Sequence, residues 1–185
     1  MVVLDLGCGV NKKAGAVGVD RRRLPSVDVV CDLNYGFLPF RDGCADTIYS
    51  SHVLEHLKDP VAFMKEARRV MSDNGKAILT LPLAGSPASF QSDHRSFFRA
   101  RDFYYYEVDN KCHYYVAEAG RFRLEEVKYR HGFPIYLQPL WLFGTLIQMV
   151  LNLNIRTVRE IYENYLLTFF PMAEFTVTLR KDQSM

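Results

Sequence analysis

The chain has 185 residues, of which 49% are apolar and 24% are charged, and its formal net charge is +2. This length and composition suit one globular domain with a substantial core. The small net charge excludes the strong positive field typical of nucleic-acid-binding proteins, so no nucleic-acid partner is expected.

Four cysteines occur without a C-x-x-C pair or zinc-finger spacing, at Cys8, Cys31, Cys44 and Cys112. Such thiols are typical of a reduced, cytoplasmic protein. A usable strand begins at Val2 with no basic leader before it, so no signal peptide is expected. The longest apolar run, Pro139 to Leu151, is too short to cross a bilayer. We therefore expect a cytoplasmic protein.

Short apolar runs bounded by turn residues predict five strands in the first half of the chain, at residues 2–6, 16–20, 27–32, 45–50 and 77–81. A helix is predicted before the last of them, with Asp59 as N-cap, Pro60 at its first position and Asn74-Gly75 as its C-terminal stop. Strands that alternate with crossover segments indicate a parallel sheet covered on both faces.

The second half has a different pattern. Residues 85–113 form a polar and aromatic stretch that predicts a long functional loop with a short helix, and residues 122–130 predict a strand. An apolar helix is predicted over 139–151. The capping box Thr157-x-x-Glu160 predicts another helix. Its expected apolar face contains Val158, Ile161, Tyr162, Tyr165, Leu166 and Phe169. Alternation of Phe175, Val177 and Leu179 predicts a last strand over 173–180.

A glycine turn, Gly7-Cys8-Gly9, follows the first predicted strand. A ligand can closely approach the backbone N–H groups of such a turn because glycine has no side chain. The dinucleotide fingerprint would require a third glycine three residues after Gly9, where this chain has Lys12. The turn therefore indicates a ligand site of a different type.

Acidic and polar side chains follow the next three predicted strands. Asp20 ends the second strand and Asp32 ends the third, while Ser51 and His52 follow the fourth. Ligands of parallel sheets bind outside the carboxyl ends of the strands. Carboxylates there can accept ribose hydroxyls and an adenine amino group. The sequence therefore predicts an adenosine-shaped pocket.

The run "VLDLGCG…GVD…VCDL…LPF…DTIYSSHVLEHL…RRVMSDNGKAILTLP", over residues 3–82, resembles the class I S-adenosylmethionine-dependent methyltransferases of the small-molecule type (methyltransferase type 11-like). The resemblance implies a Rossmann-like, doubly wound, mostly parallel seven-stranded sheet with an antiparallel last strand. A helical insertion, about residues 133–171, would precede that strand. It also implies one domain over 1–185, with the cofactor bound by 1–82 and the substrate by 83–185.

The same resemblance implies S-adenosylmethionine as the cofactor and assigns its contacts. The glycine turn and the strand before it would hold the methionine part, one acid the ribose, another acid and its neighbour the adenine, and the residues after the fourth strand the sulfonium side. The residues implied for the methionine part are Asp5, Gly7, Cys8 and Gly9. Asp20 is implied for the ribose, Asp32 and Leu33 for the adenine, and Ser51 and His52 for the sulfonium side.

Two departures from the family bear on function. Only residues 10–15 separate the glycine turn from the second strand, where the family has a full helix whose dipole favours the cofactor carboxylate. A loop is expected there, with Lys12 or Lys13 supplying positive charge. An N-terminal lid helix, which the family often has, is not expected either, because the first predicted strand begins at Val2. These departures motivate a second hypothesis, a non-catalytic cofactor-binding module that acts through its apolar insertion.

The segment His52-Val53-Leu54-Glu55-His56 also matches H-x-x-E-H, the zinc signature of the inverzincin peptidases. Two histidines at i and i+4 share one face of a helix, and the glutamate can serve as a base beside a metal. Such a peptidase would need a third ligand on a nearby helix. The segment instead follows a buried strand at the predicted cofactor pocket, so we expect no metal.

His94 is the candidate for a substrate-side base, because it follows the fifth strand and so is expected near the transferred methyl group. Asp93 could orient it, and a histidine bonded to backbone is an equal alternative. Arg95, Arg99 and Arg101 could bind an acidic group of the substrate. A solvated basic face is favoured over that role.

The methyl acceptor is expected to be a small molecule or a lipid-linked molecule. The apolar insertion, about 133–171, could act as a substrate-side cap, a homodimer surface or a peripheral membrane contact. The cap or dimer is favoured because the first helix of the insertion lacks the basic polar face of a membrane-surface helix.

Overall fold

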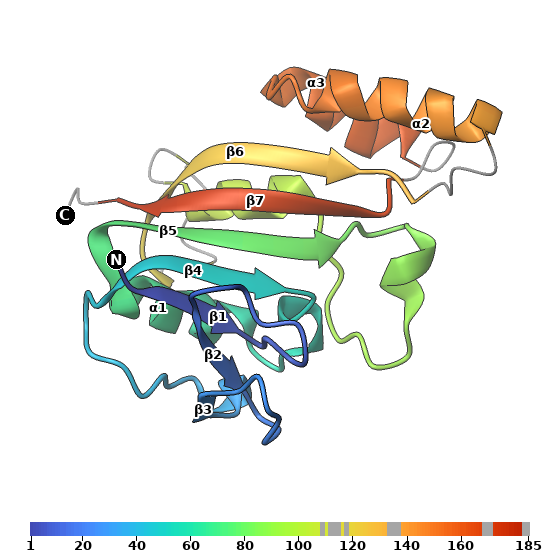
Figure 1. Ribbon diagram of the computed structural model, residues 1–185. Helices are drawn as coiled ribbons and strands as arrows, with labels where there is room; N and C mark the ends of the chain where they lie inside the picture. The colour runs from blue at the N-terminus through green and yellow to red at the C-terminus, as the bar shows by residue number, and fades with distance from the viewer. Residues whose placement is uncertain (108–109, 111–115, 117–118, 133–137, 168–171, 183–185) are drawn as a thin grey trace.

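A computed structural model describes the chain except residues 108–109, 111–115, 117–118, 133–137, 168–171 and 183–185. Its seven strands form one sheet in the order β3-β2-β1-β4-β5-β7-β6 (Figure 1). The bounds are β1 Val3–Leu6, β2 Val17–Asp20, β3 Val29–Val30, β4 Ala45–Ser51, β5 Met71–Pro82, β6 Phe122–Arg130 and β7 Glu174–Lys181. The first five strands pair in parallel, and β7 is antiparallel to β5 and β6. The predicted Rossmann-like sheet is confirmed.

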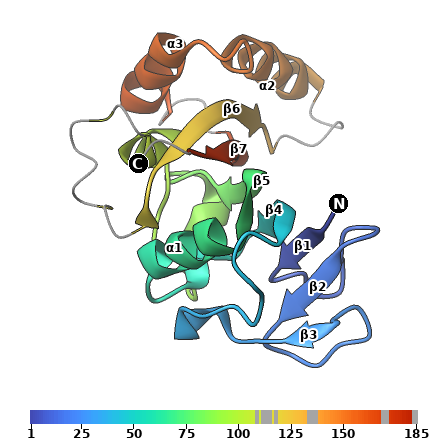
Figure 2. The same ribbon diagram turned by 90° about the vertical axis from the view of Figure 1, so that its left-hand side faces the viewer.

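The helices are α1 Pro60–Val70, α2 Gln138–Leu151 and α3 Arg156–Ile161, with a π-helical turn over Tyr162–Leu166. Short 3₁₀ turns cover Leu33–Tyr35, Leu54–His56, Pro87–Phe90 and Ala100–Tyr106. Figure 2 shows α1 against one face of the sheet, and α2 with α3 beside β6. The predicted insertion before the last strand is therefore present, although 133–137 and 168–171 lie outside the described residues.

The first helix begins where the sequence predicts and ends earlier. The Asp59 side chain accepts a hydrogen bond from the Ala62 N–H at 2.9 Å, as an N-cap does. The predicted stop at Asn74-Gly75 is wrong, because α1 ends at Val70 and both residues lie within β5. There β5 bulges against β4 between Met71 and Lys76. Met71 is fully buried, so strand pairing and burial determine the end of the helix.

Strand β6 is an edge strand whose free side is covered by side-chain amides of the insertion. The Tyr129 N–H donates to Asn152 Oδ1 at 2.7 Å, and Asn152 Nδ2 donates to the Tyr129 carbonyl at 3.2 Å. Asn154 contacts two residues of the strand: its Oδ1 accepts from the Val127 N–H at 3.3 Å, and its Nδ2 donates to the Glu125 carbonyl at 3.2 Å. Each side-chain amide thus bonds one N–H and one carbonyl of β6, as a neighbouring strand would. The insertion therefore closes an edge that would otherwise be open to another chain.

The predicted start of α3 is wrong, and its predicted apolar face is confirmed only at Val158 and Tyr162. Its N-cap position is Ile155, which provides no side-chain cap, so the capping box at Thr157 and Glu160 does not form. The buried residues of this segment are Arg159, Tyr162, Glu163 and Leu167, whereas Ile161, Tyr165 and Leu166 are exposed. Phe169 lies outside the described residues. Two charged side chains, Arg159 and Glu163, are buried at positions that a hydrophobic pattern assigns to solvent.

The burial of Glu163 is explained by its hydrogen bonds. Its carboxylate accepts from the Tyr129 hydroxyl at 2.7 Å, from Ala100 N–H at 2.9 Å and from Arg101 N–H at 3.4 Å. Burial raises the pKa of this carboxyl, and the three donors oppose that shift. Glu163 therefore connects α3 to β6 and to the turn that begins at Ala100.

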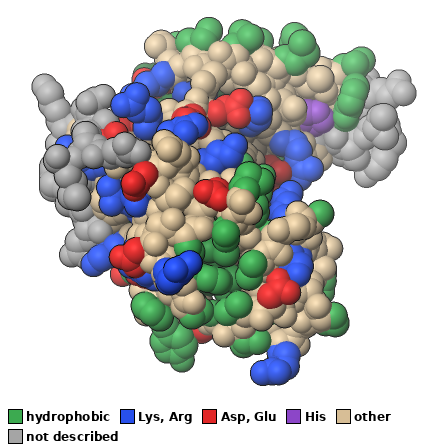
Figure 3. Space-filling view, turned by 60° about the vertical axis from the view of Figure 1, so that its left-hand side comes forward, with side chains coloured by type: hydrophobic (Ala, Val, Ile, Leu, Met, Phe, Trp, Pro, Cys, Tyr) green, Lys and Arg blue, Asp and Glu red, His purple; other side chains and the backbone are tan. Residues whose placement is uncertain are grey.

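Among the described residues, no helix is long and apolar enough to cross a membrane. Several apolar side chains of α2 are nevertheless exposed, and Figure 3 shows hydrophobic side chains gathered over this part of the molecule. The exposed residues of α2 are Leu142, Phe143, Leu146, Met149 and Val150.

Replacement of Asn152 by alanine removes both contacts with the backbone of Tyr129. We expect the free energy of unfolding to fall by about 1–2 kcal/mol in urea denaturation, because a backbone donor and acceptor lose their partners. Asn11→Ala, at an exposed loop position, serves as the control and should change stability by less than about 0.5 kcal/mol. Equal stability of the two variants would contradict the edge-capping role.

Replacement of Glu163 by alanine leaves the Tyr129 hydroxyl and the Ala100 N–H without their acceptor. We expect a loss of roughly 2–4 kcal/mol of unfolding free energy, measured by the same denaturation. The matched control is Glu160→Ala, which removes a surface ion pair with Arg156 and should cost less than about 1 kcal/mol. Equal stability of Glu163→Ala and Glu160→Ala would contradict the stabilising role of the buried Glu163 hydrogen bonds.

Candidate functional site

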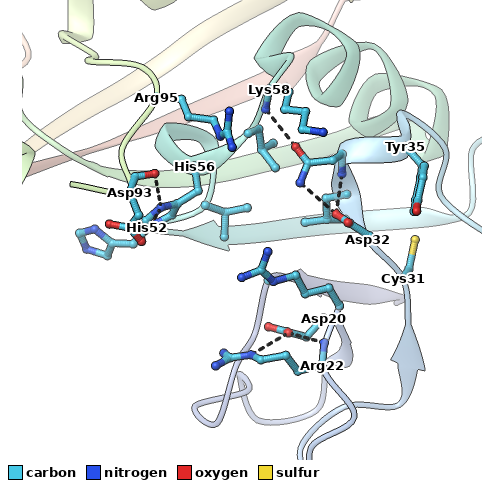
Figure 4. Close-up of a pocket in the computed structure, with 16 residues that line it drawn as sticks. Asp20, Arg22, Cys31, Asp32, Tyr35, His52, His56, Lys58, Asp93 and Arg95 are labelled. Carbon is cyan, nitrogen blue, oxygen red and sulfur yellow. Dashed lines mark hydrogen bonds and ion pairs between the residues drawn. The ribbon is translucent and has the colours of Figure 1, made fainter. Parts of the chain in front are cut away.

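A cavity of about 710 Å³ lies at the carboxyl ends of β1, β2, β3 and β4 (Figure 4). Its size is that of a small-molecule site. Five of the residues assigned to the cofactor line it, namely Gly7, Asp20, Asp32, Leu33 and His52, and so do Asp93 and Arg95 from the substrate-side candidates. The other named residues, Asp5, Cys8, Gly9, Ser51 and His94, do not.

The glycine turn is fixed by a steric requirement at Gly7. Its backbone has φ +76°, and a Cβ at this position would lie 2.3 Å from Cγ2 of Val53. Its N–H donates to the Val19 carbonyl at 2.7 Å. Only glycine fits this close approach between the turn after β1 and the segment after β4.

Two residues of the turn and the acid before it shape the site from outside the cavity. Cys8 is buried, and the Gly9 N–H donates to Asp20 Oδ2 at 3.0 Å. Asp5 Oδ2 accepts from the Lys13 N–H at 2.7 Å. Burial raises the pKa of Asp5, and this bond opposes the shift. Asp5 therefore holds the loop after the glycine turn.

The cavity wall at β2 is formed by Asp20, which is 6% exposed. Its Oδ1 accepts from Arg22 N–H at 2.9 Å, and its Oδ2 accepts from Gly9. The exposed Arg22 side chain makes a third contact, with Nε 3.4 Å from Oδ1. A carboxylate has about four acceptor positions, so Asp20 retains capacity for a ligand. The backbone bonds hold it in one orientation beside the cavity.

The cavity wall at β3 is formed by Asp32 and its turn. Asp32 Oδ1 accepts from the backbone and the side-chain amide of Asn34, both at 3.0 Å. The backbone bond to Asn34 lowers the pKa of Asp32, so the carboxylate is charged at neutral pH. Asn34 Oδ1 in turn accepts from the Lys58 N–H at 3.0 Å. These contacts connect the loops after β3 and β4 (Figure 4).

No helix separates β1 from β2, in a connection that the structure describes completely, so the predicted loop is confirmed. Neither lysine of that loop lines the cavity, because Lys12 pairs with Asp28 at 2.8 Å and Lys13 lies over the ring of Tyr49. The cations that do line it are Arg21, Arg22, Lys58 and Arg95. Arg21 and Arg22 belong to the basic run directly after Asp20, which could have indicated cations at this cavity, whereas nothing in the sequence indicated Lys58.

His52 lies at the cavity edge in an uncommon left-handed backbone conformation, φ +54°. Its Nε2 lies 3.1 Å from Glu174 Oε2, and its Nδ1 lies 3.4 Å from Glu55 Oε1. These carboxylates, Glu174 first, raise the pKa of His52 to about 9. The imidazole therefore carries a positive charge at neutral pH. Ser51, its neighbour, is exposed at the end of β4.

Asp93 and His94 do not pair with each other. Asp93 Oδ2 lies 3.3 Å from Nδ1 of His56, and His94 Nδ1 lies 3.0 Å from the Ser89 carbonyl. The backbone-bonded alternative for His94 is therefore the one observed. Sequence reasoning missed His56 as a cavity residue, because its contact with Asp93 joins residues 37 positions apart.

The three arginines after His94 separate into two roles. Arg99 donates to the Glu163 carbonyl at 3.2 Å, and Arg101 donates to Asn164 Oδ1 at 2.6 Å. Both therefore hold the insertion. Arg95 lines the cavity and is the one of the three placed to meet a ligand.

Residues 4–79 match a family model described as a methyltransferase domain. The chain is 33% identical over 103 residues to an uncharacterized 37.1 kDa protein in transposon TN4556 of Streptomyces fradiae. It is 31% identical over 97 residues to a Mycobacterium tuberculosis (strain ATCC 25618 / H37Rv) protein named a probable S-adenosylmethionine-dependent methyltransferase. Each match spans 43% of this chain, and 29% and 35% of the respective relatives.

Solved structures share the fold over nearly the whole chain. An S-adenosylmethionine-dependent methyltransferase from Archaeoglobus fulgidus has TM-score 0.62 at 16% identity, covering 97% of this chain and 85% of its own. The [4+2]-cyclase SpnF has TM-score 0.56 at 17% identity, covering 97% and 73%. Because these identities are low and the two proteins are named for different activities, the likeness establishes the fold alone.

Replacement of Gly7 by alanine tests the close approach to Val53. We expect about 1 kcal/mol of destabilisation from the positive φ and a further 1–3 kcal/mol, roughly, from the clash. Gly15→Ala is the matched control, because it has φ +75° with open space around its Cβ and so carries the backbone cost alone. In urea denaturation, the free energy of unfolding should be clearly lower for Gly7→Ala than for Gly15→Ala. The double variant Gly7→Ala/Val53→Ala should regain part of the stability that Gly7→Ala loses. Equal losses in the two single variants would contradict the steric requirement.

Proposed function

This chain carries a class I S-adenosylmethionine-dependent methyltransferase fold, and from that premise we propose that it binds S-adenosylmethionine in the cavity and transfers the methyl group to a small-molecule acceptor. The observation that carries the proposal is the meeting of the glycine turn, Asp20 and Asp32 around one cavity at adjacent strand ends. That arrangement matches the order in which an adenosyl cofactor presents its methionine, ribose and adenine parts.

Each cavity wall has a role in this proposal. Asp20 accepts the ribose hydroxyls with the acceptor positions that its backbone bonds leave open. Asp32, charged and fixed by Asn34, accepts from the adenine amino group beside Leu33. The bare backbone at Gly7 admits the methionine part of the cofactor.

The cations of the cavity replace the helix dipole that the short first crossover lacks. Arg21, Arg22 and Arg95 line the wall, together with Lys58. Guanidinium groups bind carboxylates in bidentate geometry, so this lining suits the cofactor carboxylate. Cations left over after cofactor binding favour an acceptor that itself carries an anionic group.

In the proposed reaction, an oxygen, nitrogen or carbon atom of the acceptor forms a bond to the methyl carbon as the carbon–sulfur bond breaks. The sulfur keeps the bonding electron pair and becomes a neutral thioether, so S-adenosylhomocysteine and methylated acceptor are the products. Any proton on the nucleophile leaves to a base or to water. The sulfonium is already activated, and the chain therefore contributes in-line alignment and exclusion of water.

A base is needed only for an acceptor that must lose a proton. His94 was predicted for this role, but it does not line the cavity and its Nδ1 is occupied by the Ser89 carbonyl. The imidazoles that reach the cavity are His52 and His56. The two carboxylates beside His52 keep that residue protonated, so it cannot serve as a base.

A second candidate function is cofactor binding without methyl transfer. It is favoured by the structural likeness to a [4+2]-cyclase, which pairs this fold with a different reaction. The exposed apolar side chains of α2, including Leu142 and Met149, then act as an interaction surface. A second copy of this chain suits that surface better than a membrane does, because α2 has no charged residue to meet lipid headgroups.

Asp20→Ala tests the ribose assignment. We expect S-adenosylmethionine affinity, measured by isothermal titration calorimetry, to fall roughly 10–100-fold through loss of two charge-assisted hydrogen bonds. Asp73→Ala, which removes an exposed ion pair with Lys181 away from the cavity, should bind as the unchanged chain does.

Transfer itself is measured with methyl-labelled cofactor and fractionated small-molecule extracts. Label should enter an acceptor fraction with the unchanged chain and much more slowly with Asp20→Ala. Cofactor binding without transfer to any fraction would favour the second candidate, and an unchanged chain that binds no cofactor would overturn both.

A further inference from the structure

In the folded chain, the H-x-x-E-H segment contacts a third histidine that lies outside the motif. His94, from the loop after β5, lies beside Glu55 and His56. One oxygen of Glu55 and one ring nitrogen from each histidine all lie within 4.8 Å of one another. We propose that Glu55, His56 and His94 bind a divalent metal ion of the zinc class. His52, the first histidine of the motif, is not one of the three ligands.

Glu55 is the observation that points to a ligand. Its side chain is 0% exposed, and neither carboxylate oxygen has a hydrogen-bond partner among the described residues. His52 Nδ1 lies 3.4 Å from Glu55 Oε1, within ion-pair distance but outside hydrogen-bond geometry. A buried carboxylate without hydrogen bonds is costly. A metal ion coordinated by this carboxylate removes that cost.

Both histidines are held as metal-binding histidines usually are. His56 Nδ1 lies 3.3 Å from the Asp93 carbonyl and 3.3 Å from the Asp93 carboxylate (Figure 4). His94 Nδ1 lies 3.0 Å from the Ser89 carbonyl. Because these oxygens only accept, each contact keeps the proton on Nδ1 and leaves the lone pair on Nε2. Such outer contacts fix the tautomer that a metal requires.

The ligand set selects the class of metal. Two imidazoles and one carboxylate hold zinc in catalytic sites, with bonds of about 2.0–2.2 Å and a further position open. Tetrahedral bonds of that length space ligand atoms by roughly 3.4 Å, so ligand atoms now up to 4.8 Å apart must approach by up to about 1.4 Å on binding. His56 and His94 are only partly buried, which leaves their side chains room for this adjustment.

The position of the group indicates what the ion would do. His56 lines the cavity next to His52, at the side predicted for the sulfonium. An open coordination position there can hold an acceptor oxygen and lower the pKa of its hydroxyl. This role rests on the proposed methyl transfer, whereas binding of the ion does not.

A competing explanation is that protonated His52 neutralises Glu55 and no metal binds. Zinc titration of the purified chain, stripped with a chelator and dialysed, decides between them by calorimetry and elemental analysis. We expect one zinc per chain. Affinity should fall at least ~tenfold in Glu55→Gln and in His94→Ala. His131→Ala, a histidine outside the group, should bind as the unchanged chain does.

Absence of stoichiometric zinc on the unchanged chain, or equal affinity in His94→Ala, would overturn the proposal and favour the His52 ion pair. His94→Asn is the second variant if the alanine variant does not fold, because its amide can still reach the Ser89 carbonyl while offering no imidazole. Cofactor titration of the same samples separates the two proposals. Cofactor binding without zinc overturns the metal site alone, and zinc binding without cofactor overturns the proposed function alone.

Discussion

Parallel pairing of β1 with both β2 and β4 is the constraint on which the site depends. Leu6 is in register with Val19 on one side and with Ser50 on the other. The residues that follow these three, Gly7, Asp20 and Ser51, are therefore side by side at the carboxyl edge of the sheet. Chain segments far apart in sequence form one cavity because their strands end at one edge of the sheet.

The second half of the chain supports this edge from a distance. Asn152 and Asn154 pair with the open side of β6, and Glu163 connects the insertion to β6 and to the turn at Ala100. The loop after β5 is thus anchored at its far end by buried hydrogen bonds. That loop carries Asp93, His94 and Arg95, so the insertion contributes to the position of these groups even though it lies beside β6.

Local signals in the sequence predicted the strands and the acids at their ends, because a buried parallel strand reads as a short apolar run closed by a turn. Asp59 and Pro60 likewise predicted the start of α1. Long-range effects could not be predicted in this way. The early end of α1 follows from pairing of Met71 with Ala45. Burial of Glu163 in the turn after α3 follows from its contacts with two other segments, β6 and the turn that begins at Ala100. The pairing of His56 with Asp93, and the approach of His94 to Glu55, require the folded loop.

The central claim is that the cavity at the ends of β1, β2, β3 and β4 binds an adenosyl cofactor. A crystal structure of the chain with S-adenosylhomocysteine tests it most directly. The account predicts ribose hydroxyls within about 2.5–3.0 Å of the Asp20 carboxylate and the adenine amino group beside Asp32. A ligand bound elsewhere on the chain, or bound in this cavity with its adenosine away from both acids, would contradict it.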